Sequence, residues 1–273
     1  MRTRTAGDLL RHWRTTRRLS QLELACRTET SARHLSFVET GRSTPSRRLL
    51  LHLSEELEIP LRERNRLLLA AGYAPVFGES RWDARQLAPI RTAMRQILTG
   101  HEPYPALAVD MNWTMVDANA GIGLFLEGIP AALLAPPVNV LRLSLHPDGM
   151  APRIVNLAEW RGHVFERLQH QIEITGSAEL AGLLAELREY PGGAQAPGLP
   201  EPDQAAVPLR LRHDGTELAF LSVTSVFGTA MNVTVAELAL ESFFPADPAT
   251  ADRLRSRISA VATDSGIGRS GPE

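Results

Sequence analysis

Residues 20–48 constrain the fold of this chain more than any other stretch, because they have the pattern of two short helices joined by a tight turn. Ser20 and Glu23 form a capping box, in which each side chain can satisfy a free backbone amide at the start of the first helix. Four residues have the spacing that lets the two helices cross closely: Leu24, Ala25, Leu35 and Val38. The stretch therefore predicts a helix-turn-helix, whose second helix is free to enter a DNA major groove.

The turn and the end of the second helix show three local signals. Thr30 or Ser31 can cap that helix, and Gly41 can end it in the left-handed conformation. A glycine is usual in the turn, because one residue there adopts a positive φ. This chain has Glu29 in that place, so the sequence predicts a strain of roughly 1 kcal/mol or a slightly altered turn.

The outward face of the second helix carries the predicted DNA contacts. With Leu35 and Val38 turned inward, it presents Ala32, Arg33, Ser36 and Phe37. Arg33 is the best candidate for a guanine contact, because its planar fork matches the acceptors of that base. Phe37 either contacts a thymine methyl group or packs against neighbouring helices. The other predicted contacts, to phosphates or groove edges, are Gln21, Thr30, Ser31, Thr40, Arg42, Ser43, Arg47 and Arg48.

Charge is distributed unevenly along the chain. The net charge of −2 combines 14 arginines and 8 acidic residues in residues 1–75 with 15 arginines and 23 acidic residues in residues 76–273. The sequence has no lysine, so arginine supplies all of these basic contacts, and its fork suits phosphates and guanine edges. The basic part coincides with the helix-turn-helix, and this agreement favours nucleic acid as a partner.

Further helices complete the N-terminal domain. Thr5 predicts the cap of a first helix. Thr44 and Pro45 predict the start of a fourth helix, because proline is favoured at the first helical position. A fifth helix follows Pro60. The sequence therefore predicts an all-α, five-helix, repressor-like domain over residues 1–75.

The rest of the chain predicts an α+β domain with an antiparallel sheet. Residues 76–100 form a connector, residues 101–250 the domain, and residues 251–273 a C-terminal helix and flexible tail. A connector helix and two short strands separated by a turn are expected at 83–99, 106–109 and 113–117. A helix follows, and this order is how a PAS-type sensor begins. Helices are expected at 156–173 and 177–189, followed by a loop at 191–206. A hairpin is expected at 207–227, and the segment 233–244 favours a strand over a helix.

The chain resembles a known family along most of its length. It is similar to the XRE class of repressor-like DNA-binding domains at Gln21, Ala25, Leu35, Val38, Glu39, Gly41 and Pro45. Residues 31–42, 45–47, 61–75, 103–117, 139–149, 209–227 and 237–247 resemble the MmyB-like transcription regulators. The resemblance covers roughly residues 6–250. It implies a PAS-like second domain with an apolar pocket suited to a fatty acid or another lipophilic small molecule.

Seven residues are candidates for contact with such a ligand. The apolar and aromatic candidates are Trp113, Leu141, Leu143, Phe220 and Phe227. Core packing explains each of these equally well, so both interpretations stay open. Arg142 or His146 is a candidate to meet a ligand carboxylate. No cofactor is expected.

No catalytic constellation is evident in the sequence. His163, Glu166 and His170 share a helix face at a spacing that can bind a metal, but a solvated face explains them better because no further ligand is evident. The sequence contains no His-Glu-x-x-His motif and no nucleophile elbow. Residues 266–271 match a dinucleotide-binding pattern only by letters, since no strand precedes them and no helix follows. The sequence therefore predicts a protein that is not an enzyme.

Together these patterns predict a transcription regulator that binds near-palindromic double-stranded DNA as a homodimer, with its affinity set by a lipophilic effector. The alternative is a C-terminal domain that serves only for dimerisation or protein docking. No run of about 18 apolar residues and no signal segment is found, so no membrane association is expected. The single cysteine, Cys26, allows no internal disulfide, which fits a reducing cytoplasm.

Overall fold

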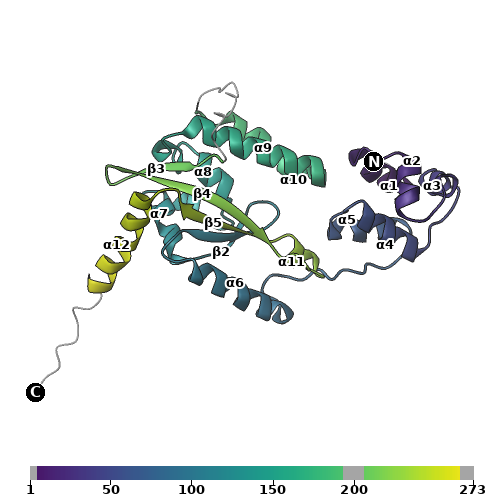
Figure 1. Ribbon diagram of the computed structural model, residues 1–273, viewed down its shortest axis with the longest axis horizontal. Helices are drawn as coiled ribbons and strands as arrows, with labels where there is room; N and C mark the ends of the chain where they lie inside the picture. Colours follow the sequence, from purple (N-terminus) through teal and green to yellow (C-terminus); the bar gives the residue numbers. More distant parts are fainter. Residues whose placement is uncertain (1–4, 193–205, 265–273) are drawn as a thin grey trace, which may run out of the picture. The chain divides into compact units, whose positions relative to one another are not determined.

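The chain forms two compact units (Figure 1). The computed structural model describes residues 5–192 and 206–264. One unit combines the N-terminal residues up to Trp82 with the short segments 173–175 and 228–236, and the other unit contains the remainder. The expected fold class is confirmed, because five helices precede an α+β region with an antiparallel sheet. The expected tail, including residues 266–271, and most of the loop at 191–206 lie outside the described residues.

The first unit contains the predicted five helices. They are α1 (Ala6–Thr16), α2 (Gln21–Arg27), α3 (Ala32–Glu39), α4 (Arg47–Glu56) and α5 (Leu61–Ala70). The capping box of Ser20 and Glu23 is confirmed at the start of α2, and Thr5 caps α1. Of the two candidates for the cap of α3, Ser31 is the one whose hydroxyl accepts from a helix amide. The predicted start of α4 at Pro45 is wrong, because Ser46 caps the helix and Arg47 is its first residue.

The turn between α2 and α3 has the strained backbone that the sequence predicts. Glu29 adopts a φ of 50° and Gly41 a φ of 72°. The four predicted crossing residues, Leu24, Ala25, Leu35 and Val38, are all buried. Gly7 allows α1 to approach the end of α3, because a Cβ atom at this position would lie 2.6 Å from the carbonyl oxygen of Val38. A close-packed core therefore holds α2 and α3 together.

A segment from the second half of the sequence completes the first unit. Residues 228–236 include the short helix α11 (Val233–Ala236), which packs against α5. The Thr234 hydroxyl donates to the Ser80 carbonyl at 2.6 Å, and the Asn232 side-chain amide donates to the Ser80 hydroxyl at 3.0 Å. The prediction of a strand over 233–244 is thus wrong for its first part, where α11 lies.

The second unit is built on a five-stranded antiparallel sheet. Its strands are β1 (Ala106–Val109), β2 (Met115–Ala118), β3 (Leu209–His213), β4 (Thr216–Val226) and β5 (Ala239–Pro245), in the order β2-β1-β5-β4-β3. The predicted hairpin is confirmed, with Asp214 and Gly215 in its two-residue turn at φ values of 46° and 71°. β2 begins two residues later than predicted. Trp113 has a φ of 64° and still belongs to the turn, which the side chain of Asp110 holds by accepting from two backbone amides.

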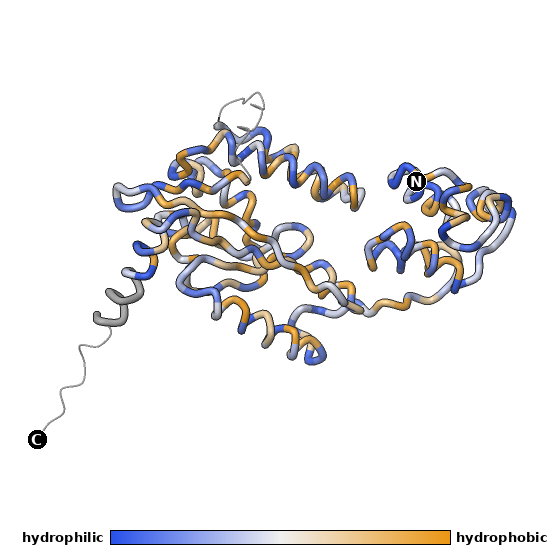
Figure 2. Tube along the Cα trace, in the orientation of Figure 1, coloured by the Kyte–Doolittle hydropathy of each residue, from blue (hydrophilic) through white to orange (hydrophobic). Residues whose placement is uncertain are grey.

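Helices cover the sheet of the second unit. They are α6 (Ala88–Gly100), α7 (Gly123–Leu126), α8 (Val140–Leu145), α9 (Leu157–Thr175), α10 (Ala178–Glu189) and α12 (Pro248–Asp264). The connector helix begins at Ala88 instead of 83, after a 3₁₀ turn at Arg85–Leu87. Figure 2 shows hydrophobic and hydrophilic residues alternating along the helices, as expected for elements with one buried side. No helix among the described residues is long and apolar enough to cross a membrane.

Candidate functional site

The exposed side of α3 presents an arginine stacked on an aromatic ring. The guanidinium carbon of Arg33 lies 5.4 Å from the centre of the Phe37 ring, one helical turn further along. Leu35 and Val38 are buried on the opposite side of the helix. The loop after α3 folds back on it, because the amides of Arg42 and Ser43 both donate to the Phe37 carbonyl, at 2.8 and 3.1 Å.

Glu39, at the end of α3, is the centre of a buried polar network. Its carboxylate accepts two hydrogen bonds from Arg14, at 2.6 and 2.9 Å, and one from the side-chain amide of Gln21 at 2.8 Å. Burial alone would raise the pKa of Glu39, but the bonds from Arg14 and Gln21 more than offset it, so the pKa lies below its ordinary value. The network joins α1, α2 and α3 and fixes the position of Gln21.

The predicted DNA-contact residues all keep some exposed surface. The side chain of Thr40 bonds back to the Ser36 carbonyl, and that of Ser31 caps α3. Arg33, Arg42, Arg47 and Arg48 are exposed, and none of them forms an ion pair with any described residue. Positive charges that the protein itself leaves unneutralised are available to phosphates.

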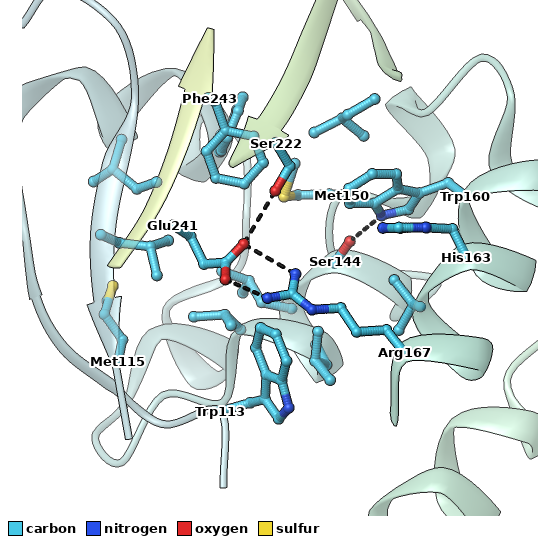
Figure 3. Close-up of a pocket in the computed structure, with 18 of the residues that line it drawn as sticks. Trp113, Met115, Ser144, Met150, Trp160, His163, Arg167, Ser222, Glu241 and Phe243 are labelled. Carbon is cyan, nitrogen blue, oxygen red and sulfur yellow. Dashed lines mark hydrogen bonds and ion pairs between the residues drawn. The ribbon is translucent and has the colours of Figure 1, made fainter. Parts of the chain in front are cut away.

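The second unit contains an apolar cavity of about 70 Å³ beside the sheet (Figure 3). Each of the five strands contributes at least one lining side chain, and residues of α7, α8 and α9 complete the wall. Its wall is mostly aliphatic and aromatic, and includes Leu107, Met115, Phe125, Leu141, Leu143 and Phe243. An apolar lining lowers the local dielectric constant and so strengthens a polar interaction made beside it.

One end of the cavity holds an ion pair between Arg167 on α9 and Glu241 on β5. Two guanidinium nitrogens donate to the two carboxylate oxygens, at 3.0 and 2.5 Å. The hydroxyls of Ser222 and Thr224 on β4 donate to the same carboxylate at 3.0 and 2.9 Å. Arg167 also lies 4.4 Å from the centre of a Trp113 ring. Only 5% of the Glu241 side chain is exposed, and its carboxylate accepts four hydrogen bonds, so the pair is a partly buried anchor.

A second polar group of residues lines the cavity near Trp160. The indole N–H of Trp160 donates to the Ser144 hydroxyl at 2.9 Å, and the His163 ring lies 5.5 Å from that of Trp160. Burial, and then the positive charge of Arg167, lower the pKa of His163, which keeps the imidazole neutral at neutral pH. Figure 3 shows the three side chains together on the helical side of the cavity.

The comparison with protein families settles what kind of protein this is. Residues 90–256 match the model of the MmyB-like transcription regulator ligand binding domain. The chain belongs to this family. The match runs from α6 into α12 and includes every residue that lines the cavity. A comparison with curated proteins finds no match.

In this MmyB-like regulator, only some of the seven candidate ligand residues lie at the cavity. Trp113, Leu141 and Leu143 line it. Phe220 is buried beside it, with its ring 5.4 Å from that of Phe125, and Phe227 lies just beyond the end of β4.

The two polar candidates have other partners. Arg142 forms a paired contact with Glu186, two bonds of 2.7 Å that raise the pKa of Arg142. His146 packs against the Tyr190 ring and accepts from the Asp148 amide at 3.0 Å. Neither residue lines the cavity.

The residues that sequence reasoning missed are the polar ones, Arg167, Glu241, His163 and Ser144. A signal for Glu241 was available, because alternation along β5 puts it on the same side as Phe243 and Ala239. A charged residue in that position predicts a buried partner. Among the residues that the structure describes, no group of three or more potential metal ligands gathers, around His163 or elsewhere.

Proposed function

We propose that this transcription regulator binds double-stranded DNA through α3 and that a lipophilic small molecule in the cavity changes its affinity. The observation that carries the DNA part is α3 itself, with Leu35 and Val38 buried on one side and Arg33 exposed on the other. The protein acts in the cytoplasm as a homodimer on a near-palindromic operator. Its two recognition helices then lie about one turn of DNA apart, roughly 34 Å.

The roles of the individual side chains follow from their surroundings. Arg33 reads a guanine edge, while Phe37 supports its guanidinium and approaches a thymine methyl group. Ala32 and Ser36 allow close approach to the groove. The remaining contacts, which position the helix on the sugar-phosphate backbone, come from Gln21, Thr30, Ser31, Thr40, Arg42, Ser43, Arg47 and Arg48.

The effector part of the proposal is supported by the apolar cavity in the matched domain. The family resemblance suggests a fatty acid as one such effector. A dry cavity of roughly 150 Å³ accepts benzene, so a space of about 70 Å³ must expand to hold a longer hydrocarbon chain. An effector that binds only the expanded state shifts the protein toward that state.

The connection between β4 and β5 supports a route from the cavity to the DNA-binding unit. Thr224 on β4 and Glu241 on β5 meet at the polar end of the cavity. The chain between these strands includes residues 228–236, which belong to the first unit and bond to Ser80. A ligand that changes the spacing of Thr224 and Glu241 therefore acts on strands that lead directly into that unit.

Two arginine substitutions test the DNA-binding role. Arg33→Ala should cost about 1–3 kcal/mol of binding to the operator and relax base preference at one position, because a base contact is lost. Arg47→Ala should weaken binding to all sequences alike and reduce the slope of log affinity against log salt by about 1. Fluorescence anisotropy with operator variants, found by footprinting DNA upstream of the protein's own gene, measures both. Unchanged base preference in Arg33→Ala would show that α3 is oriented differently.

Native mass spectrometry with organic extraction tests the sensing role. A lipophilic compound recovered at one molecule per chain supports it. A well-folded dimer that is reproducibly empty favours the alternative, in which the C-terminal domain serves only for dimerisation or protein docking.

A further inference from the structure

The lining of the cavity carries no free charge. Arg167 and Glu241 are its only ionisable lining residues besides His163, and they neutralise each other through two hydrogen bonds. The neutral state of His163 adds no charge at neutral pH. A ligand that enters this space therefore meets an apolar wall and polar groups whose charges already cancel.

Arg167 already has protein partners for three of its five N–H donors, and its charge is paired with that of Glu241. Two of its nitrogens bond to Glu241, one of them also bonds to the Thr224 hydroxyl, and its plane lies near the Trp113 ring. Glu241 in turn accepts four hydrogen bonds, which matches the lone pairs of its two oxygens. A ligand carboxylate reaches Arg167 only by displacing Glu241 into an apolar space, or by lying beside it as a second negative charge. Both arrangements are unfavourable.

His163 and Ser144 have hydrogen-bonding capacity left over. The Ser144 oxygen accepts from Trp160, but its own O–H has no acceptor among the described residues. The His163 ring has no hydrogen-bond partner in the described part of the chain. A neutral imidazole offers one donor and one acceptor. These two side chains line the cavity and fit an uncharged oxygen, such as a hydroxyl or a carbonyl.

We propose that the cavity selects an uncharged, largely apolar molecule with one hydroxyl or carbonyl oxygen, bound by His163 and Ser144. The Arg167–Glu241 pair excludes the ionised form of a carboxylic acid. This inference rests on the proposed sensing function and narrows its ligand class, because an alcohol, ketone, ester or lactone fits while a fatty-acid anion does not.

Chain-matched probes test the selection on the full-length protein. Octan-1-ol should bind with one molecule per chain, and at least about tenfold more tightly than octanoate at pH 7.5, since the anion leaves buried charges unpaired. Calorimetric titration measures both affinities, and quenching of tryptophan fluorescence reports on occupancy because Trp113 and Trp160 line the cavity. This comparison needs no variant, so it stands even where a substitution prevents folding.

Glu241→Gln supplies the second test. Removing the negative charge frees Arg167 for a ligand carboxylate, so the affinity of the protein for octanoate should rise at least about tenfold. The preference for octan-1-ol over octanoate should then be abolished or reversed. The matched control is Glu217→Gln, which breaks the exposed pair with Arg210 at 2.5 Å outside the cavity and should leave both affinities unchanged.

Each outcome decides a different point. Octanoate binding to the unchanged protein as tightly as octan-1-ol overturns the selection and leaves the sensing function in place. If Glu241→Gln leaves the affinity for octanoate unchanged, the Arg167–Glu241 pair is not what excludes carboxylates. Binding of neither probe overturns this selection, whereas the sensing role is decided separately by native mass spectrometry and the DNA-binding role by Arg33→Ala.

Discussion

Glu39→Ala should lower the free energy of unfolding of the N-terminal unit by about 3–5 kcal/mol, because it leaves a buried cation without its partner. Glu39 is 3% exposed, and its carboxylate accepts two hydrogen bonds from Arg14 and one from the side-chain amide of Gln21. The loss should be visible in urea unfolding followed by circular dichroism and by the fluorescence of the buried Trp13.

The pH dependence of this contribution has a defined sign. Folding lowers the pKa of Glu39, so its contribution is complete above the ordinary glutamate pKa of about 4.5 and disappears as the pH falls through the folded-state value. The control is Glu217→Ala, whose exposed partner Arg210 implies a loss of less than about 1 kcal/mol. Equal effects of the two substitutions would contradict a central role for the Glu39 network.

Phe220→Ala should destabilise the second unit by about 3–5 kcal/mol, the usual cost of removing a fully buried aromatic ring. The Phe220 side chain is 0% exposed and its ring meets that of Phe125 edge to face at 5.4 Å. The space left behind lies next to Phe125, which lines the apolar cavity. Urea unfolding with an unchanged denaturant slope would identify a loss of stability without a change in the surface exposed.

A second phenylalanine provides the control for this experiment. Phe244 lies on β5 opposite Leu221 of β4 and is 42% exposed. Phe244→Ala removes the same atoms from a site where water already reaches the ring, so its cost should be clearly smaller. Equal costs at the two positions would mean that burial on the cavity side of the sheet is not what makes Phe220 important.

The fold was predictable where the signals are local. The capping box of Ser20 and Glu23, the positive φ of Glu29 and the hairpin turn at Asp214 all depend on residues within a few positions of one another. The errors occur where local signals compete. Pro45 and Ser46 both mark a helix start, and the hydroxyl of Ser46 forms the actual cap. The helix at 233–236 depends on packing against α5, which the sequence does not display.

The polar part of the candidate site could not be assembled from sequence in the same way. Arg167 and Glu241 are 74 positions apart and meet only because α9 lies over the strand that holds Glu241. A residue such as Trp113 was predictable as buried, but packing in a core and lining a cavity give the same sequence pattern. Arg142 shows the converse difficulty: the sequence predicts it as a ligand contact, but it forms an ion pair with Glu186 on α10 and does not lie at the cavity.

The segment 228–236 also determines where this protein can be divided. A fragment that ends at Trp82 would contain all five N-terminal helices and still lack α11, together with the Asn232 and Thr234 side chains that bond to Ser80. The unit that carries α3 is therefore discontinuous in sequence. Exchanging it between related regulators requires two transplanted pieces, and a single crossover after the fifth helix would join an incomplete surface to a foreign loop.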